Sequence, residues 1–161
     1  MSTRRIAAAA RRLLEASTLC TISTVSAGGR PHANTAYFSW NRSFDLVWLS
    51  DPGSTHSRHL RTTPSAAVVV YDSRQTWGEA DRGIQLFGSA SEATGSARRE
   101  AERSYARRFP DYTDAGDYRF YRFRPRRLKL FDETVFGSGV FVSAAVRGGD
   151  VAWTRTDVVA A

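Results

Sequence analysis

The fold is decided by residues 18–50, which read TLCTISTVSAGGRPHANTAYFSWNRSFDLVWLS. Residues 18–25 are rich in β-branched side chains, and Gly28-Gly29 follows them as a hairpin-type turn. Residues 31–40 and 44–50 continue as two further β-rich runs across a short polar turn. Three strands in succession, joined by short turns, predict an antiparallel sheet, because parallel neighbours need long crossover connections.

The remaining sequence predicts further strands and three helices. Apolar residues at helical spacing predict a first helix over residues 5–16. After residue 50 we expect, in order, a helix over 55–61 capped by Ser54, strands over 66–71 and 83–94, a helix over 97–109 capped by Ser96, and strands over 118–131 and 137–146. The tail, residues 147–161, has only weak strand character at 151–153. The sequence therefore predicts a single domain over residues 1–161 with its core at about 18–146. Its class is mainly β (α+β), a six- to seven-stranded antiparallel barrel with short flanking helices.

Composition indicates a globular protein of one domain, since 42% of the 161 residues are hydrophobic and 24% are charged. No apolar run approaches the ~18–20 residues of a membrane helix. The apolar part of the N-terminal segment is too short for a secretion signal, so we expect a cytoplasmic protein without membrane attachment. The single cysteine, Cys20, lies in an apolar run and is expected to be a buried, unreactive thiol.

Charge is the ambiguous part of the composition. The formal net charge is +7, and all of the 23 cationic side chains except Lys129 are arginines. Such an excess favours an anionic partner, whether nucleic acid, a membrane surface or a phosphorylated cofactor, without choosing among them.

Residues 50–58 form the densest polar cluster of the chain. Ser50 ends a predicted strand, and Ser54, Thr55, His56 and Arg58 begin a predicted helix. Free N–H groups and the helix dipole at such a start suit a phosphate group. The same residues would also be explained by an ordinary helix start in which Ser54 only caps the backbone.

Gln85 lies between two glycines, Gly83 and Gly88, in a predicted strand. Glycines beside an amide would allow a flat ligand to approach the backbone closely. A solvent-facing glutamine on an edge strand explains the segment equally well.

Other constellations favour structure over chemistry. The three histidines, His32, His56 and His59, lack the acidic or cysteine partners of a recognised metal spacing, so no metal site is expected. No nucleophile elbow, phosphate-binding loop or dinucleotide fingerprint is present. Residues 118–127 alternate aromatic and arginine side chains, which could bind single-stranded nucleic acid, but a strand with one packed face is the favoured interpretation.

In their order along the chain these segments resemble the pyridoxamine 5'-phosphate oxidase-like family of FMN-binding split barrels. The resemblance covers residues 19 to about 136, and most closely a short bacterial branch of that family. The motifs that carry it are TIST at 21–24, GRPHA at 29–33, FDLVWLS at 44–50, STHSRHL at 54–60, TPSAAV at 63–68, GIQLFG at 83–88 and RRFP at 107–110.

The resemblance implies a homodimer with two flavins bound between split barrels. By position, Asn34, Thr35, Ala36 and Tyr37 would line the flavin ring, largely through their backbone. The phosphate end would be held by Ser50, Ser54, Thr55 and His56, and Gln85 would reach the ring region. The family commonly has Arg or Lys at the positions of Thr55 and His56 and a cation at that of Ser39. Arg58 or a partner-chain arginine would compensate for these missing charges.

The function expected from the resemblance is that of an FMN-dependent oxidoreductase acting on an unknown small molecule. The flavin would carry the electron chemistry, with Tyr37, Trp40, Trp77 or Phe136 as candidate walls for the substrate. Two alternatives remain open: a deazaflavin-dependent reductase on the same fold, and a flavin- or haem-binding protein without turnover. Nucleic acid is not an expected partner.

Overall fold

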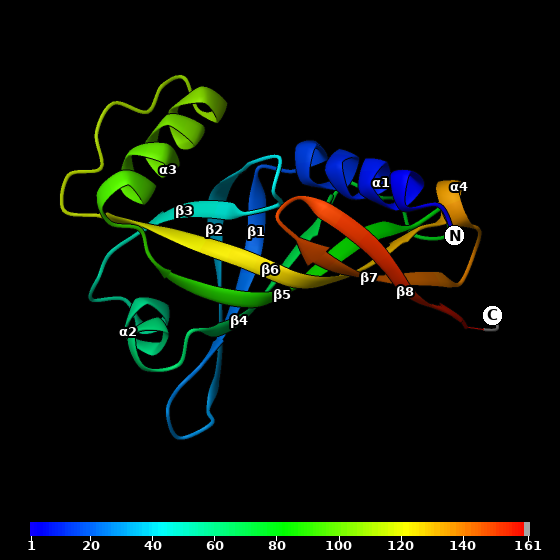
Figure 1. The fold of residues 1–161 in the computed structure, drawn as a ribbon, viewed down its shortest axis with the longest axis horizontal. Coiled ribbons are helices and arrows are strands. Elements are labelled where there is room, and N and C mark those ends of the chain that lie inside the picture. The colour runs from blue at the N-terminus through cyan, green and yellow to red at the C-terminus, as the bar shows by residue number, and fades with distance from the viewer. Residues whose placement is uncertain (160–161) are drawn as a thin grey trace.

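The computed structural model describes residues 1–159, which form a closed barrel of six antiparallel strands (Figure 1). The barrel order is β3-β2-β1-β4-β5-β6, and pairing between β3 and β6 closes it. The barrel strands are β1 (Leu19–Val25), β2 (Pro31–Trp40), β3 (Leu46–Ser50), β4 (Ser65–Tyr71), β5 (Arg82–Glu92) and β6 (Arg119–Asp132). Two further strands, β7 (Val140–Arg147) and β8 (Asp150–Val158), extend the sheet beyond β6.

The alternation of side chains along each strand fills the barrel. Val68 on β4 pairs with Leu86 on β5, which pairs with Leu128 on β6, and all three are fully buried. Successive strand residues point to opposite faces, so the residues that alternate with these buried ones form the outer face of the barrel. The antiparallel barrel expected from the hairpin pattern is therefore confirmed.

Four helices accompany the barrel within residues 1–159 (Figure 1): α1 (Thr3–Ala16), α2 (Thr55–Thr62), α3 (Gly95–Arg108) and the single turn α4 (Glu133–Phe136). The apolar stripe of α1, including Ile6 and Leu14, joins the barrel core. α3 covers the outer face of β3 and β6, where Ala101 and Tyr105 pack with Val47 and Phe120. No helix in this part of the chain is both long and apolar enough to cross a membrane.

The structure corrects two details of the sequence prediction. Residues 150–158 form a full strand, β8, although the sequence indicates only weak strand character at 151–153. Most of β8 is exposed, so it lacks the alternation that identifies half-buried strands. Ser96 is not a helix cap: α3 begins at Gly95, and Thr94 before it makes no side-chain capping bond.

Residues 118–127 lie mostly in β6, as the structural interpretation of that segment predicts. Phe120, Tyr121 and Phe123 are each at most 1% exposed, so their rings are occupied by the core. Arg122 is also engaged, by Asp45 and Glu100. Stacking of nucleic-acid bases on these rings is therefore not available.

Candidate functional site

The polar segment at the start of α2 forms one connected network of hydroxyl groups. Ser50, at the end of β3, lies 3.1 Å from Ser54 (Oγ to Oγ), and Ser54 donates to Ser57 Oγ at 2.8 Å. The Ser54 side chain also accepts from the Ser57 backbone N–H, which confirms the predicted cap. Ser50 and Ser57 are buried.

Histidines complete this network, and all three of the chain's histidines meet here. His56 Nε2 lies 2.6 Å from Ser50 Oγ, and the His56 ring is stacked on that of His32 with 6.2 Å between centroids. His59 meets the His32 ring edge-on at 5.8 Å and its Nδ1 lies 3.2 Å from Thr24 Oγ1. We call Ser50, Ser54, His56 and Ser57, with His32 and His59, the α2 cluster.

His32 was not among the predicted site residues, since it is 24 positions before His56 in the sequence. The hairpin register contained the signal that could have found it. Thr24 on β1 pairs with His32 on β2, and Thr24 also contacts His59. Because α2 is docked beside the turn end of this hairpin, it brings the histidines together.

Electrostatics favour a neutral His56 in the α2 cluster. Burial lowers the pKa of His56 below its ordinary value, and the neighbouring His32 and His59 lower this pKa further. The guanidinium of Arg58 donates to the Gly53 carbonyl and to Thr55 Oγ1. The α2 cluster thus offers hydroxyl and imidazole groups, with Arg58 holding the turn before the helix.

The predicted ring-binding residues of β2 divide between the two faces of the sheet. Thr35 and Tyr37 are exposed on the outer face, and the Tyr37 side chain lies edge-on to Phe109 at 5.8 Å. Asn34 and Ala36 point toward the barrel interior, where Ala36 packs on the core. Asn34 Oδ1 is buried and has no hydrogen-bond partner among residues 1–159. The side chains of all four residues therefore cannot face one ligand, although their backbone groups could.

Gln85 lies on the same outer face as Thr35 but at a distance. The strand register runs from Thr35 through Thr21 and Val69 to Gln85. Three strand spacings separate the ends of this row, or about 14 Å. A ligand touching both would have to span the outer face of β1 and β4.

The two glycines beside Gln85 leave no room for a ligand, contrary to the close-approach interpretation. A Cβ atom at Gly83 would lie 2.8 Å from the Phe131 ring, and one at Gly88 would lie 2.0 Å from the Arg124 carbonyl oxygen. Both glycines serve packing of β5 on β6, and Gly88 lies where the register of this ladder shifts.

The candidate substrate walls also lie apart in the fold. Trp77 is 98% exposed in the loop between β4 and β5. Phe136 lies on α4 with the Arg5 guanidinium 5.5 Å from its ring centroid, and Trp40 donates to Glu15 at 3.1 Å. No group of three or more His, Cys, Asp or Glu side chains within residues 1–159 is arranged to hold a metal ion.

The comparison with protein families matches residues 6–132 to the model described as pyridoxamine 5'-phosphate oxidase. The chain belongs to this family. The match includes the whole barrel, the α2 cluster and Gln85, and it ends before β7 and β8. A search of curated proteins found no significant match.

Solved structures with the same fold have diverse descriptions. A haem-binding protein from Mycobacterium smegmatis aligns with TM-score 0.67 and 22% identity over 86% of this chain, which spans only 57% of that protein. A putative pyridoxamine 5'-phosphate oxidase from Listeria innocua aligns with TM-score 0.62 and 16% identity, covering 78% of this chain and 98% of the other. An FAD-binding protein from Mesorhizobium loti aligns with TM-score 0.59 and 14% identity, covering 73% and 88%. At these identities the likeness establishes the family's fold.

Proposed function

We propose that this chain binds a phosphate-bearing flavin, FMN in the first instance, and acts as a flavin-dependent oxidoreductase on a small molecule. The observation that carries the proposal is the α2 cluster, which lies inside the segment matched to the family. The first N–H groups of a helix have no partners within the helix, and the helix dipole adds to their attraction for a phosphate. Hydroxyl donors from Ser50 and Ser54 lie beside these N–H groups.

The donor set fits a phosphate, although it contains fewer fixed charges than the family commonly uses. Ser50, Ser54 and Thr55 would donate from hydroxyl groups, and His56 from Nε2 when protonated. The backbone of residues 34–37 and the amide of Gln85 would face the ring, with Tyr37 beside it. A flavin, when bound, supplies hydride and electron transfer.

The part of this chain in such a reaction is binding and orientation. The α2 cluster would fix one end of the cofactor, while the outer face of β2 and β1 would support the flat ring. His56 would hold a proton at Nε2 against the phosphate, since a neighbouring anion favours the imidazolium form. No side chain of the protein is required as a nucleophile.

A homodimer is part of the proposal, because the outer face of the sheet carries exposed apolar side chains. Leu19 is 43% exposed, Tyr37 57% and Tyr71 51%, on β1, β2 and β4. A second copy of the chain placed there would bury these side chains and enclose a cofactor on the same face. Sedimentation at equilibrium should give twice the monomer mass, and Leu19→Glu should shift it towards the monomer.

The decisive experiment is the Ser54→Asp variant, loaded with FMN and compared with wild type. Aspartate is also a good helix cap, so the fold should persist. The added carboxylate would repel a phosphate, and FMN affinity should fall by about 100-fold or more. The measurement is fluorescence titration of FMN, supported by mass spectrometry of any small molecule released by heat from the purified wild-type protein.

Ser96→Asp is the matched control, since Ser96 lies in the first turn of α3 and is exposed. FMN affinity should be unchanged in this variant. Equal FMN affinity in wild type and Ser54→Asp would show that α2 does not hold the phosphate.

Binding without turnover is the second candidate function, and it is favoured by the haem- and FAD-binding descriptions of similar structures. Absorption of the purified protein separates the cofactors: flavin bands support FMN or FAD and a Soret band supports haem. A deazaflavin reductase would retain deazaflavin in preference to FMN in a competition titration. A protein that holds flavin but cannot be reduced by any nicotinamide donor or small-molecule substrate would support the carrier function.

A further inference from the structure

A polar hollow lies away from the α2 cluster, between α3 and the turn that joins β2 to β3. Its volume is about 560 Å³, within the ~300–1,000 Å³ range of small-molecule sites. Its charged and aromatic lining consists of Arg42, Arg103, Arg107, Arg122, Glu100 and Trp40. We call it the α3 groove; none of its lining residues belongs to the α2 cluster.

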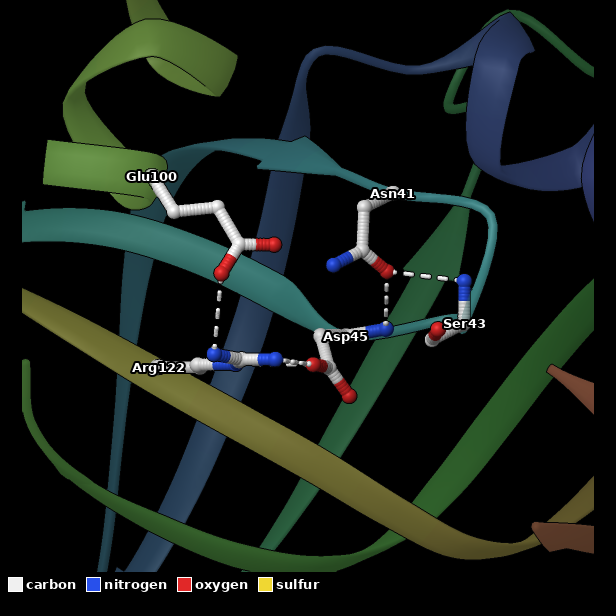
Figure 2. Close-up of polar contacts among 5 residues, drawn as sticks. All are labelled: Asn41, Ser43, Asp45, Glu100 and Arg122. Atoms are coloured by element: carbon white, nitrogen blue, oxygen red, sulfur yellow. Dashed lines mark hydrogen bonds and ion pairs between the residues drawn. The ribbon is translucent and has the colours of Figure 1, made fainter. Parts of the chain in front are cut away.

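The acidic groups of this region are already engaged. Arg122 donates to Asp45 from Nε at 2.7 Å and also from Nη2, and its Nη1 lies 3.4 Å from Glu100 (Figure 2). The Asp45 side chain is only 9% exposed, whereas that of Glu100 is 54% exposed. The guanidinium of Arg122 therefore pairs with the carboxylates of both Asp45 and Glu100.

The other three arginines of the groove are exposed and uncompensated. Arg42, Arg103 and Arg107 make no ion pair with any carboxylate in residues 1–159. Arg103 and Arg107 are four residues apart on α3 and so lie on one side of the helix. Three forked donors converging on one hollow produce a site of positive potential suited to carboxylate or phosphate oxygens.

The turn that carries Arg42 is held in a fixed conformation. Asn41 Oδ1 accepts hydrogen bonds from the backbone N–H groups of Ser43 and Asp45 at 2.9 and 3.1 Å (Figure 2). Phe44 adopts the left-handed backbone region with φ of 64°, and its fully buried ring compensates for this conformation. The rim of the groove is thus preorganised on the β2–β3 side.

Apolar groups complete the groove. Trp40 is partly buried and its indole N–H donates to Glu15, which fixes the orientation of the ring. Val47, Ala97 and Ala101 contribute small apolar side chains. Aromatic and apolar walls beside a few polar groups are the usual arrangement of a site for an organic ligand.

We propose that the α3 groove binds a small organic anion with a flat apolar body, its carboxylate or phosphate held by Arg42, Arg103 and Arg107 and its body against Trp40. This site is separate from the proposed cofactor site. Binding would quench or shift the Trp40 fluorescence, and an aromatic phosphate monoester should bind more tightly than either of its halves.

The test is calorimetric titration of the full chain with phenyl phosphate, inorganic phosphate and phenol in physiological salt, where diffuse attraction is screened. Phenyl phosphate should bind saturably and more tightly than the other two probes. The double variant Arg103→Ala/Arg107→Ala should weaken phenyl phosphate binding by about tenfold or more, because charged hydrogen bonds are lost. Arg98→Ala on the same helix removes one charge outside the groove and should leave the affinity unchanged.

Two further measurements exclude unfolding of the variants and binding at the α2 cluster as causes of the result. Thermal unfolding of each variant should match wild type, since the replaced arginines are exposed. Phenyl phosphate binding should also persist in Ser54→Asp, which affects only the α2 cluster. The proposal is overturned if phenyl phosphate does not saturate, if inorganic phosphate binds equally well, or if Ser54→Asp rather than the double arginine variant abolishes binding.

Discussion

The α2 cluster and the α3 groove are both suited to anions, but they use different chemistry. The α2 cluster combines serine hydroxyls with three histidines, and Arg58 on the same helix bonds to the turn. The α3 groove carries four guanidinium groups, of which one is paired with carboxylates. The first is thus a site whose charge depends on pH, whereas the charge of the second is fixed over the whole physiological range.

The two regions would therefore recognise anions by two different physical mechanisms. Hydroxyl and N–H donors bind a phosphate by geometry and become stronger when an adjacent imidazole takes up a proton. Guanidinium groups bind by charge as well, but they are subject to screening by salt where they are exposed. Changes that alter one region and leave the other intact test this distinction.

The largest effect is expected from Asp45→Ala, which removes the buried partner of Arg122 in the wall of the α3 groove. Loss of one member of a buried ion pair leaves a desolvated charge, which costs about 3–5 kcal/mol. The lower end applies here, since the Arg122 side chain is 20% exposed and keeps Glu100 nearby. Urea unfolding of the variant should therefore show a loss of about 3 kcal/mol.

Asp157→Ala provides the comparison for this stability loss. Asp157 pairs with Arg155 on β8 at 2.9 Å, where the Arg155 side chain is 69% exposed and that of Asp157 is 32% exposed. Its removal should cost less than about 1 kcal/mol. If the two aspartate variants unfold alike, the Asp45–Arg122 pair does not contribute to the fold as a buried pair.

The next effect concerns pH and uses two phosphate monoesters, FMN at the α2 cluster and phenyl phosphate at the α3 groove. Both ligands lose phosphate charge similarly as the pH falls. The ratio of their affinities therefore reports only the titration of groups in the protein. FMN binding should favour protonated His56, and the ratio of FMN affinity to phenyl phosphate affinity should rise by up to about tenfold between pH 8 and pH 6. Parallel titrations measure both affinities.

The folding stability of the protein without ligand should change in the opposite direction, falling as the pH falls. Because the pKa of His56 is lowered in the folded state, its neutral form is stabilised by the fold. The associated stability is present above the ordinary histidine range and is lost as the pH falls through the lowered pKa of His56. Melting temperatures without ligand should decline below about pH 6.5, and His56→Gln should flatten this decline. If the melting temperature of His56→Gln declines equally steeply, groups other than His56 cause the loss of stability.

The barrel could be predicted from the sequence because local signals determine it. The runs 18–25 and 31–40 alternate inward and outward residues, and the glycine turn between them sets their register. Ser54 was predictable as a cap from its position before a short helix. β8 was not, since its exposed residues show no alternation. The turn Gly148-Gly149, with positive φ at both residues, was the available sign of a hairpin.

The two anion-facing regions were predictable to different degrees. Ser50, Ser54 and His56 are close in sequence, so their convergence on one helix start follows from local structure. The α3 groove depends on how α3 docks on the barrel. Its pair of Asp45 and Arg122 is separated by 77 positions, and no local pattern links these residues. Long-range packing of this kind requires the structure.

A smaller effect distinguishes the starts of the two helices. Ser54→Ala should cost about 1 kcal/mol, since the side chain caps the Ser57 N–H and links three hydroxyl groups. Ser96→Ala should change stability by less than about 0.5 kcal/mol, because Ser96 lies within α3 and is exposed. Urea unfolding of both variants gives the comparison. Equal losses would mean that the hydroxyl network contributes nothing beyond a surface serine.

The smallest effect is a change in the titration of one side chain. His32→Ala removes the stacked imidazole whose charge disfavours protonation of His56, so the pKa of His56 should rise. His59→Ala should raise it less, because the charge of His59 has the weaker influence of the two. Nuclear magnetic resonance of the imidazole carbon-bound protons measures both shifts in the protein without ligand. An unchanged His56 pKa in both variants would mean that burial alone lowers it, with no contribution from the neighbouring imidazoles.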